Sequence, residues 1–394
     1  MREVVIAGAV RTAIGRFGGA LTGVTAVELG ALVVDAALQR TPIPPADVDQ
    51  VILGHVVQAG CGLNTARQVA LRAGMPVSVP AFTVNMVCAS GLKAVALAAQ
   101  AIAAGEHDVI VAGGMENMSA APFLLPQARW GHRLGDTTLV DALLSEALHD
   151  HSADCHMGIT AENLATAYRI SREEQDLFAV QSQQKAGAAL ATGAFQAEIV
   201  PVRVPQRRGE PLLFDTDEFA RPDTTVATLA QLQPAFKPDG TVTAGNASGI
   251  NDGAAAMVLL SREEAERRSI RPMGRVVASA AAGVEPRHMG LGPVPATRLA
   301  LRKAGLRLTD IQTVELNEAF AAQALAVMRE LDLDSANTNR RGGAIALGHP
   351  VGASGARILV TLLHLLASSN QHLGLAALCV GGGQGMAMIV ERRD

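Results

Sequence analysis

Cys88 is the residue best placed for nucleophilic chemistry. It lies between an apolar run rich in β-branched residues, 81–87, and an alanine-rich run that ends before Gly105. This pattern is typical of a strand, a sharp turn and a helix closed by glycine. A thiol at a helix start lies near free N–H groups and the positive end of the helix dipole, which favour a thiolate. We therefore expect Cys88 to have a lowered pKa and to be reactive.

Three other stretches carry partners that such a thiol would need. His349 sits between glycine and proline just before an apolar run, where it could act as a base. Cys379 precedes consecutive glycines, whose N–H groups can surround a negative charge. Asn317 could hold a water or donate a hydrogen bond, and Glu318 could orient a histidine. Taken singly, each has an ordinary alternative as a turn histidine, a buried cysteine or a helix-capping asparagine.

Composition argues against several classes of partner. Hydrophobic residues make up 49% of the 394 positions but aromatic residues only 3%, and the net charge is -4. Few aromatic platforms and no long Lys or Arg run argue against a nucleic-acid or anionic-membrane partner. The stretch between Arg357 and Glu391 holds no Asp, Glu, Lys or Arg, but polar breaks within it favour a buried helix and strand over a membrane span.

The four cysteines, Cys61, Cys88, Cys155 and Cys379, are widely spaced. No C-x-x-C pair or zinc spacing occurs, so we expect reduced thiols, no metal site and a cytoplasmic location. The chain enters a strand pattern at once, and no targeting peptide is visible. Neither G-x-G-x-x-G after the first strand nor Gly-Lys-Ser/Thr is present, which leaves dinucleotide and P-loop binding unsupported.

An internal repeat organises the chain. Four short segments recur in the same order at similar separations, and Ala89-Ser90-Gly91 matches Ala353-Ser354-Gly355 among them. Two copies of one βα unit explain such a pattern. The other three pairs are 3–6 with 275–278, 48–51 with 311–314, and 111–114 with 379–382.

Strands alternate with helical stretches in both copies, which predicts an α/β fold. We expect an N-terminal half at 1–120, completed by about 249–270, and a C-terminal half at 271–394. The proline-rich segment 121–248 between them is expected to be a substrate-binding loop domain, with one clear helix that a capping box at Ser171 begins. The expected helices are 26–39, 64–73, 89–104, 171–191, 296–304, 319–330 and 353–366.

Together the motifs resemble those of the thiolase family. They are Cys88-Ala89-Ser90-Gly91, Asn317-Glu318-Ala319-Phe320, Gly348-His349-Pro350 and Cys379-Val380-Gly381-Gly382-Gly383, in the order and spacing of that family. The resemblance covers essentially the whole chain, including the segment 11–19. It implies the thiolase fold, in which two similar βα halves form a layered αβαβα structure with an inserted loop domain.

The resemblance implies ping-pong acyl transfer between CoA thioesters in fatty acid metabolism. Cys88, activated by His349, would attack an acyl-CoA and carry an acetyl group. Cys379 would then remove an α-proton from a second acetyl-CoA, or protonate the enolate in thiolysis. Two oxyanion holes would stabilise the charge, one from His349 and a water held by Asn317, the other from the N–H groups of Cys88 and Gly381.

The resemblance also implies substrates and their contacts. Cys155-His156-Met157-Gly158 looks like the motif of short-chain, acetoacetyl-CoA thiolases, so the expected substrates are acetyl-CoA, acetoacetyl-CoA and CoA, with no other cofactor. A narrow acyl pocket would be lined by His156, Met157, Leu148, Met289 and Phe320. Residues near the CoA moiety would be Ser248, Arg221, Phe236 and Ala244.

Some alternatives remain open. A broader 3-ketoacyl-CoA or 3-oxoadipyl-CoA thiolase would share the chemistry, and a decarboxylating condensing enzyme would share the nucleophile. A non-catalytic relative should have lost one of the four motif residues, and all four are present. Some mitochondrial relatives bind potassium through a tyrosine, at the position of Phe219 here, which puts activation by potassium in doubt. Relatives are dimers or tetramers, and we expect a homotetramer, a dimer of dimers, with 129–133 as an exposed assembly loop.

Overall fold

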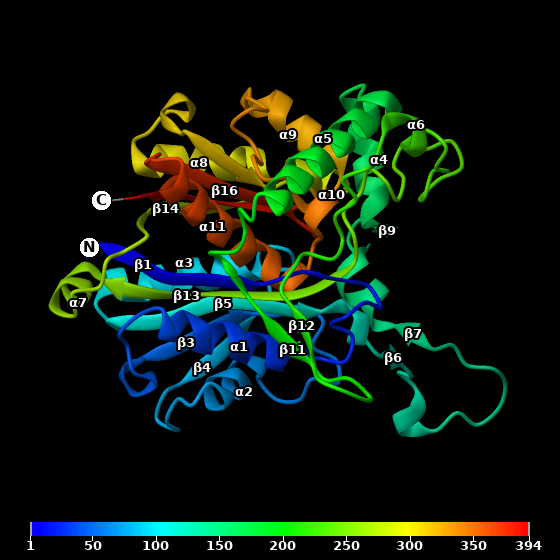
Figure 1. Cartoon of the computed structure of the whole chain (residues 1–394). Helices are drawn as coiled ribbons and strands as arrows, with labels where there is room; N and C mark the ends of the chain where they lie inside the picture. The colour runs from blue at the N-terminus through cyan, green and yellow to red at the C-terminus, as the bar shows by residue number, and fades with distance from the viewer. Residues whose placement is uncertain (1, 393–394) are drawn as a thin grey trace.

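The computed structural model describes residues 2–392 and arranges them in five layers, helix, sheet, helix, sheet and helix (Figure 1). The strands follow one path, β15-β16-β17-β14-β1-β13-β5-β3-β4. At the middle of this path β1 and β14 pair at only two positions, Val5 with Arg275 and Ile6 with Gly274. Beyond that seam the sheet continues as two separate layers, one in each half of the chain.

The two halves repeat one strand order, which confirms the predicted repeat. In the first half β1 (Val4–Thr12), β13 (Asn251–Ser261), β5 (Val109–Asn117) and β3 (Gln50–Gly54) are neighbours, with β4 (Ala81–Val84) at the edge. The second half runs β14 (Gly274–Gly283), β17 (Gln384–Glu391), β16 (Leu373–Val380) and β15 (Thr313–Leu316). In each half the first two pairs, β1–β13 and β13–β5 or β14–β17 and β17–β16, are antiparallel, and the next, β5–β3 or β16–β15, is parallel. The first half continues with one more parallel pair, β3–β4, which has no counterpart among the described strands of the second.

Helices cover both outer faces. On the first sheet lie α1 (Ala26–Gln39) and α2 (Thr65–Arg72), and on the second α8 (Pro293–Ala304) and α9 (Ala321–Leu331) (Figure 1). Thr25 and Glu28 form the capping box of α1. Such a cap satisfies N–H groups that have no partner inside the helix, and it fixes where the helix begins. These helices confirm the predicted ranges to within a few residues.

Two helices fill the central layer, α3 (Ser90–Ala104) and α11 (Val351–Ser368). The repeated glycines lie where they cross. A Cβ added to Gly91 would be 2.9 Å from the backbone nitrogen of Ala356, and one added to Gly355 would be 2.7 Å from that of Leu92. Real Cβ atoms do not approach so closely, so the Ala-Ser-Gly repeat marks the close packing of the two halves.

Both central helices are long and apolar enough to cross a membrane by composition. The windows Val87–Ala104 and Val351–Ser368 have mean hydropathies of 1.6 and 1.5. However, 56% and 83% of them are buried inside the protein, and each packs between the two sheets. Their apolar character is therefore explained by the core they build. The predicted buried helix and strand near the C-terminus correspond to α11 and β16.

The segment between the halves holds more regular structure than predicted. The expected helix is α5 (Arg172–Ala191), and its capping box at Ser171 is confirmed. A second helix, α4 (Met157–Ala167), was not predicted. Its N-cap is His156, whose imidazole Nδ1 accepts the N–H of Gly158 at 3.0 Å. Histidine is not a usual N-cap residue, so the sequence carried no ordinary start signal.

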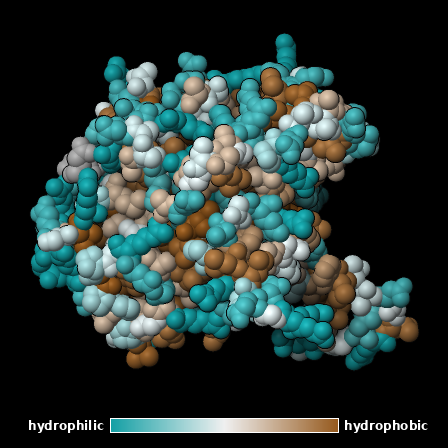
Figure 2. Space-filling view, viewed as in Figure 1, coloured by the Kyte–Doolittle hydropathy of each residue, from teal (hydrophilic) through white to brown (hydrophobic). Residues whose placement is uncertain are grey.

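A loop projects from the body between β6 (Phe123–Leu124) and β7 (Val140–Asp141) (Figure 1). It carries apolar side chains in the open: Trp130 is 86% exposed and Leu134 94%. Figure 2 shows this projection as a separate lobe with apolar atoms on it. The remaining elements are short, namely β2 (Gly15–Arg16), β8 (His149–Asp150), β9 (Cys155–His156), β10 (Ile199–Val200), β11 (Val202–Val204), β12 (Leu212–Phe214), α6 (Val226–Leu229), α7 (Arg262–Arg267) and α10 (Ala344–Leu347).

Candidate active site

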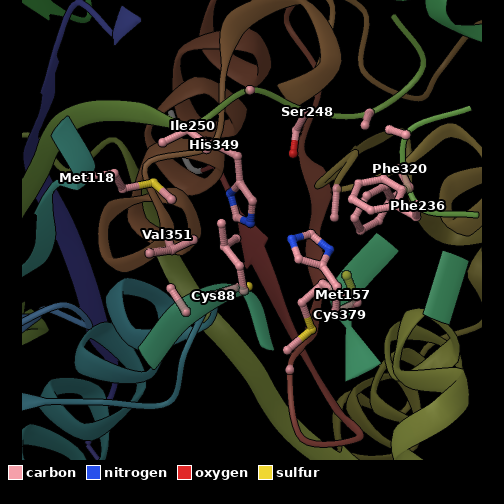
Figure 3. Close-up of a pocket in the computed structure, with 18 of the residues that line it drawn as sticks. Cys88, Met118, Met157, Phe236, Ser248, Ile250, Phe320, His349, Val351 and Cys379 are labelled. Atoms are coloured by element: carbon pink, nitrogen blue, oxygen red, sulfur yellow. The ribbon is translucent and has the colours of Figure 1, made fainter. Parts of the chain in front are cut away.

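One largely apolar cavity of about 250 Å³ brings most of the predicted site residues together (Figure 3). They come from both halves and from the segment between them. Asn317 and Arg221 are the two predicted residues that do not line it. Those that do are Cys88, Leu148, His156, Met157, Phe236, Ala244, Ser248, Met289, Phe320, His349, Cys379 and Gly381.

Cys88 stands on a tight turn between β4 and α3. Val87, just before it, has a φ of 45°, a left-handed conformation that β-branched residues rarely adopt. Ser90 holds this turn: its hydroxyl accepts the N–H of Met86 at 2.9 Å and donates to the carbonyl of Val87 at 2.6 Å. The strained turn therefore presents Cys88 to the cavity, two residues before the helix begins rather than within its first turn.

The resting Cys88 thiol is not the lowered-pKa group that we predicted. Burial raises its pKa to about 11, and the carboxylate of Glu116 adds to the rise. Hydrogen bonding from the N–H groups of Gly381 and of Cys88 itself acts in the opposite direction and lowers the pKa. The expectation was wrong because desolvation by the surrounding chain outweighs what the backbone N–H groups contribute.

His349 faces Cys88 across the cavity, held by hydrogen bonds on its other side (Figure 3). Its Nδ1 lies 2.6 Å from the hydroxyl of Ser354, which in turn donates to the carbonyl of Pro350 at 2.8 Å. Because that hydroxyl has one hydrogen and gives it to Pro350, it accepts from His349 Nδ1–H. The lone pair is then on Nε2, which is buried and has no partner among the described residues.

The imidazole is neutral at rest. Burial lowers the pKa of His349 to about 4, and the nearby Arg357 guanidinium contributes to the fall. Above that pH the ring can accept a proton at Nε2. A neutral thiol therefore faces a neutral base, and this arrangement favours proton transfer during attack over a preformed ion pair.

Cys379 ends β16 on the opposite wall and is fully buried. Burial raises the pKa of its thiol strongly, and the negative charge of a Cys88 thiolate would raise it further, which places the two sulfurs within electrostatic reach. The turn that follows has Gly382 and Gly383 at φ of 83° and 77°. Glycine adopts this left-handed backbone without strain, and the N–H of Gly381, at the start of the turn, lowers the pKa of Cys88.

Asn317 follows β15 behind this wall. Its backbone N–H donates to Ala377 at 2.9 Å, while both side-chain atoms are buried without a partner among residues 2–392. Two buried polar atoms without a protein partner are suited to binding a bridging water, as the family mechanism implies.

Glu318 does not orient the histidine, contrary to the sequence-based prediction. Its carboxylate accepts hydrogen bonds from Ser182 at 2.7 Å, Asn339 at 2.7 Å and the N–H of Ile345 at 3.3 Å. It therefore ties α5 to the loop that leads into His349. Ser354, five residues after His349, makes the contact that we had assigned to Glu318.

Bulky side chains narrow the cavity beside Cys379. Phe236 stacks on His156 with ring centroids 4.7 Å apart and meets Phe320 edge-on at 6.1 Å. A Cβ on Gly158 would lie 2.3 Å from the Phe236 ring, so only glycine lets that ring lie against α4. Met157 lies beside Cys379 (Figure 3). The space left for an acyl chain is accordingly short.

The expected CoA-contacting residues divide into two groups. Ala244 and Ser248 line the cavity mouth, where the N–H of Ser248 donates to the carbonyl of Ala319 at 3.0 Å. Arg221 lies outside the cavity on the surface, with its guanidinium 5.8 Å from the centre of the Phe219 ring.

Several residues that shape the site were not identified from the sequence. Asn251 accepts the N–H of His349 at 2.8 Å, and the buried carboxylate of Glu116 accepts the N–H of Gly352 at 2.9 Å near the start of α11. Met118, Ile250 and Val351 form the wall beside His349 (Figure 3). Ser354 did have a sequence signal that could have been followed, because it lies in the repeated Ala353-Ser354-Gly355 segment, four residues after Pro350.

Comparisons with known proteins agree with this geometry. Models of the thiolase N-terminal domain and the thiolase C-terminal domain match residues 4–263 and 270–392. The chain is 57% identical over 392 residues to an acetyl-CoA acetyltransferase of Pseudomonas aeruginosa, covering 100% of both. The Bacillus anthracis acetyl-CoA acetyltransferase structure has a TM-score of 0.98 at 47% identity, covering 100% of this chain and 99% of that one. Human mitochondrial 3-ketoacyl-CoA thiolase has a TM-score of 0.97 at 44% identity, with coverage of 100% and 99%.

Proposed function

The chain belongs to the thiolase family, and we propose that it catalyses the reversible condensation of two acetyl-CoA molecules to acetoacetyl-CoA and CoA. The reaction would run through an acetyl group carried on Cys88. The observation that supports this most directly is the meeting of two cysteines and a neutral histidine in one small apolar cavity. The similarity to acetyl-CoA acetyltransferases over the full chain supports the choice of acyl group.

In the first half-reaction the Cys88 sulfur attacks the thioester carbonyl while its proton moves to Nε2 of His349. The raised pKa of the thiol and the lowered pKa of His349 disfavour an ion pair before the attack, so the proton moves to the Nε2 lone pair as the C–S bond forms. The leaving CoA thiolate takes its proton from Cys379. His349 is then an imidazolium whose Nδ1–H is accepted by Ser354, and the protein carries an acetyl group and one thiolate.

In the second half-reaction the Cys379 thiolate removes an α-proton from a second acetyl-CoA. The resulting enolate attacks the acetyl carbonyl on Cys88, and the Cys88 sulfur leaves with the proton held by His349. All three groups thus return to their resting states. Because burial raises the pKa of Cys379, its thiolate is basic enough for a weakly acidic α-hydrogen.

Two sets of donors suit the two thioester oxygens. The N–H groups of Cys88 and Gly381 both lower the pKa of the Cys88 thiol, and they would serve the oxygen of an acetyl group carried there. Protonated His349 and a water bound by Asn317 would serve the enolate oxygen. Each set acts in a buried apolar cavity, where such donors are most effective.

The cavity wall formed by Met157, Phe236 and Phe320 limits the length of the acyl group that can bind. We favour acetyl and acetoacetyl groups because these side chains fill the volume that a longer chain would need. A broader 3-ketoacyl-CoA thiolase is the second candidate, supported by the 44% identity to the human mitochondrial enzyme of that name.

One assay tests the activity and the chain length together. We expect CoA-dependent loss of acetoacetyl-CoA, monitored by absorbance, with a kcat/KM at least about tenfold above that for a six-carbon 3-ketoacyl-CoA, since a few methylene groups are worth 1–3 kcal/mol each in a tight pocket. Equal rates would favour the broader enzyme. No loss of either substrate would refute the proposed activity.

We also propose a homotetramer built as a dimer of dimers. The edge strand β4 carries Phe82, which is 38% exposed, and such an apolar edge suits pairing with a second copy. The projecting loop with Trp130 and Leu134 supplies a separate apolar surface. Light scattering should give a tetramer for the native protein and a dimer for a Trp130→Ser, Leu134→Ser double variant. A native monomer or dimer would contradict the proposal.

The remaining assignments follow from the same chemistry. We place the enzyme in the cytoplasm and in fatty acid metabolism, supported by its four unpaired cysteines. Thiols, an imidazole and backbone N–H groups supply every role in the cycle, so the proposed reaction calls for no cofactor besides CoA as a substrate. We divide the chain into halves at 1–120 with 249–270 and at 271–394, because β13 lies between β1 and β5.

A further inference from the structure

A carboxylate in the inserted segment accepts a hydrogen bond from the glycine turn of the C-terminal half, residues 381–383. Asp150, on β8, is 3% exposed, and its Oδ2 accepts the N–H of Gly382 at 2.9 Å. Its Oδ1 accepts the N–H groups of Ser152 and Ala153 at 2.8 and 3.1 Å, in the turn that joins β8 to β9. Asp150 thus bridges two parts of the chain that are far apart in sequence.

Gly382 directly follows Gly381, whose N–H lowers the pKa of the Cys88 thiol. Gly381 and Cys88 line the same cavity. The peptide plane after Gly381 ends in the Gly382 N–H, which Asp150 accepts. With glycines at 381, 382 and 383 this turn has no side chain of its own to hold its direction. A buried acceptor on the adjacent N–H can supply that restraint.

The same hairpin also carries the wall of the cavity. Leu148 precedes β8, and His156 and Met157 follow Cys155 at the end of β9. A Cβ on Gly381 would lie 2.7 Å from Cε of Met157, so the wall and the glycine turn are packed in direct contact. Any shift of the β8–β9 hairpin would therefore also move the N–H of Gly381.

We propose that Asp150 is a positioning residue, which fixes the Gly381 N–H toward the Cys88 acyl oxygen by holding Gly382. The role for the acyl oxygen rests on the proposed function, while the effect on the Cys88 sulfur does not. Three N–H donors surround the carboxylate, and only a group with two acceptor oxygens serves both the hairpin and the glycine turn.

Asp150→Asn tests this with almost no change in volume. The amide oxygen can keep the local bonds to Ser152 and Ala153, which leaves its NH₂ group facing the N–H of Gly382. Two donors repel, so the turn should shift. Asp154→Asn is the matched control: Asp154 lies in the same hairpin, its side chain is 93% exposed, and its recorded ion pair is to His149. Asn also tolerates its left-handed φ of 50°.

Two measurements are made on each variant. In acetoacetyl-CoA thiolysis, Asp150→Asn should lower kcat by about 10- to 100-fold with KM within about twofold, because a misdirected oxyanion donor acts on the transition state. Alkylation of Cys88 by iodoacetamide at fixed pH, measured on the Cys88 peptide, should slow at least about threefold, since the thiolate loses an N–H donor. Asp154→Asn should match the native protein in both.

The outcomes separate the role of Asp150 from the proposed function. Suppose that the native protein shows no thiolysis, yet Cys88 is alkylated more slowly in Asp150→Asn than in the native protein. This result would refute the proposed activity but support the positioning role of Asp150. Native kcat and native alkylation would overturn the positioning role, even if the thermal midpoint fell, and so would an equal loss in Asp154→Asn. Should Asp150→Asn be insoluble, Asp150→Ser keeps a short acceptor for the hairpin and should give the same two losses.

Discussion

Replacing Cys88 by alanine should abolish the acetyl adduct and lower thiolysis of acetoacetyl-CoA by about 10⁴-fold or more, since removal of a nucleophile takes away the covalent pathway itself. Cys88 is the thiol on the strained turn, opposite the free Nε2 of His349. Intact-mass analysis after incubation with acetyl-CoA measures the adduct. The native protein should gain the mass of one acetyl group per chain.

Cys61→Ala is the control for this prediction. Cys61 is also a partly exposed free cysteine, but it does not line the cavity. This variant should keep the adduct and the native rate. An equal adduct on the Cys88→Ala protein, or none on the native one, would show that another residue carries the acetyl group or that no acyl-enzyme forms.

Replacing Cys379 by alanine should separate the two half-reactions. The variant should still become acetylated on Cys88, because a CoA thiolate is a good leaving group, while condensation and thiolysis fall by roughly 10²- to 10⁴-fold for want of the acid–base group. The same intact-mass measurement, made beside the turnover assay, detects the retained adduct.

Cys379 is fully buried, so the fold of this variant must be checked as well. Its thermal midpoint is compared with that of Cys379→Ser, which keeps the side-chain volume and should show the same retained adduct with low turnover. Native turnover in either variant would remove Cys379 from the mechanism. A loss of the adduct in both would show that Cys379 acts before the acyl-enzyme forms.

The sequence was sufficient for features that depend on local signals or on repetition. The bounds of α1 follow from the Thr25 cap, and the Ala-Ser-Gly repeat correctly indicated two similar halves. Cys88 and His349 were found because each lies just before a central helix, at corresponding turns of the two halves. Cys379 was found because consecutive glycines follow it closely. Helix caps, repeats and glycine-rich turns of this kind involve residues close together in the sequence, so they can be recognised without a structure.

Features that depend on packing could not be predicted in the same way. The rise in the pKa of Cys88 comes from burial by the folded chain. The side-chain partners of Glu318 lie on α5 and on the loop between α9 and α10. Asp150 is similar, since its partner Gly382 is 232 residues away along the chain. No local pattern encodes such a distance.

The position of β13 also governs the order in which the protein can be built. This strand lies in the interior of the first sheet, between β1 and β5, yet it follows the entire inserted segment in the chain. During synthesis, β1 and β5 must therefore wait with unpaired edges until residues 251–261 have left the ribosome. The inserted segment is thus made, and free to fold, before the first sheet can close. The central helix α11, which packs between the two sheets, is made later still, and of the described elements only β16 and β17 follow it.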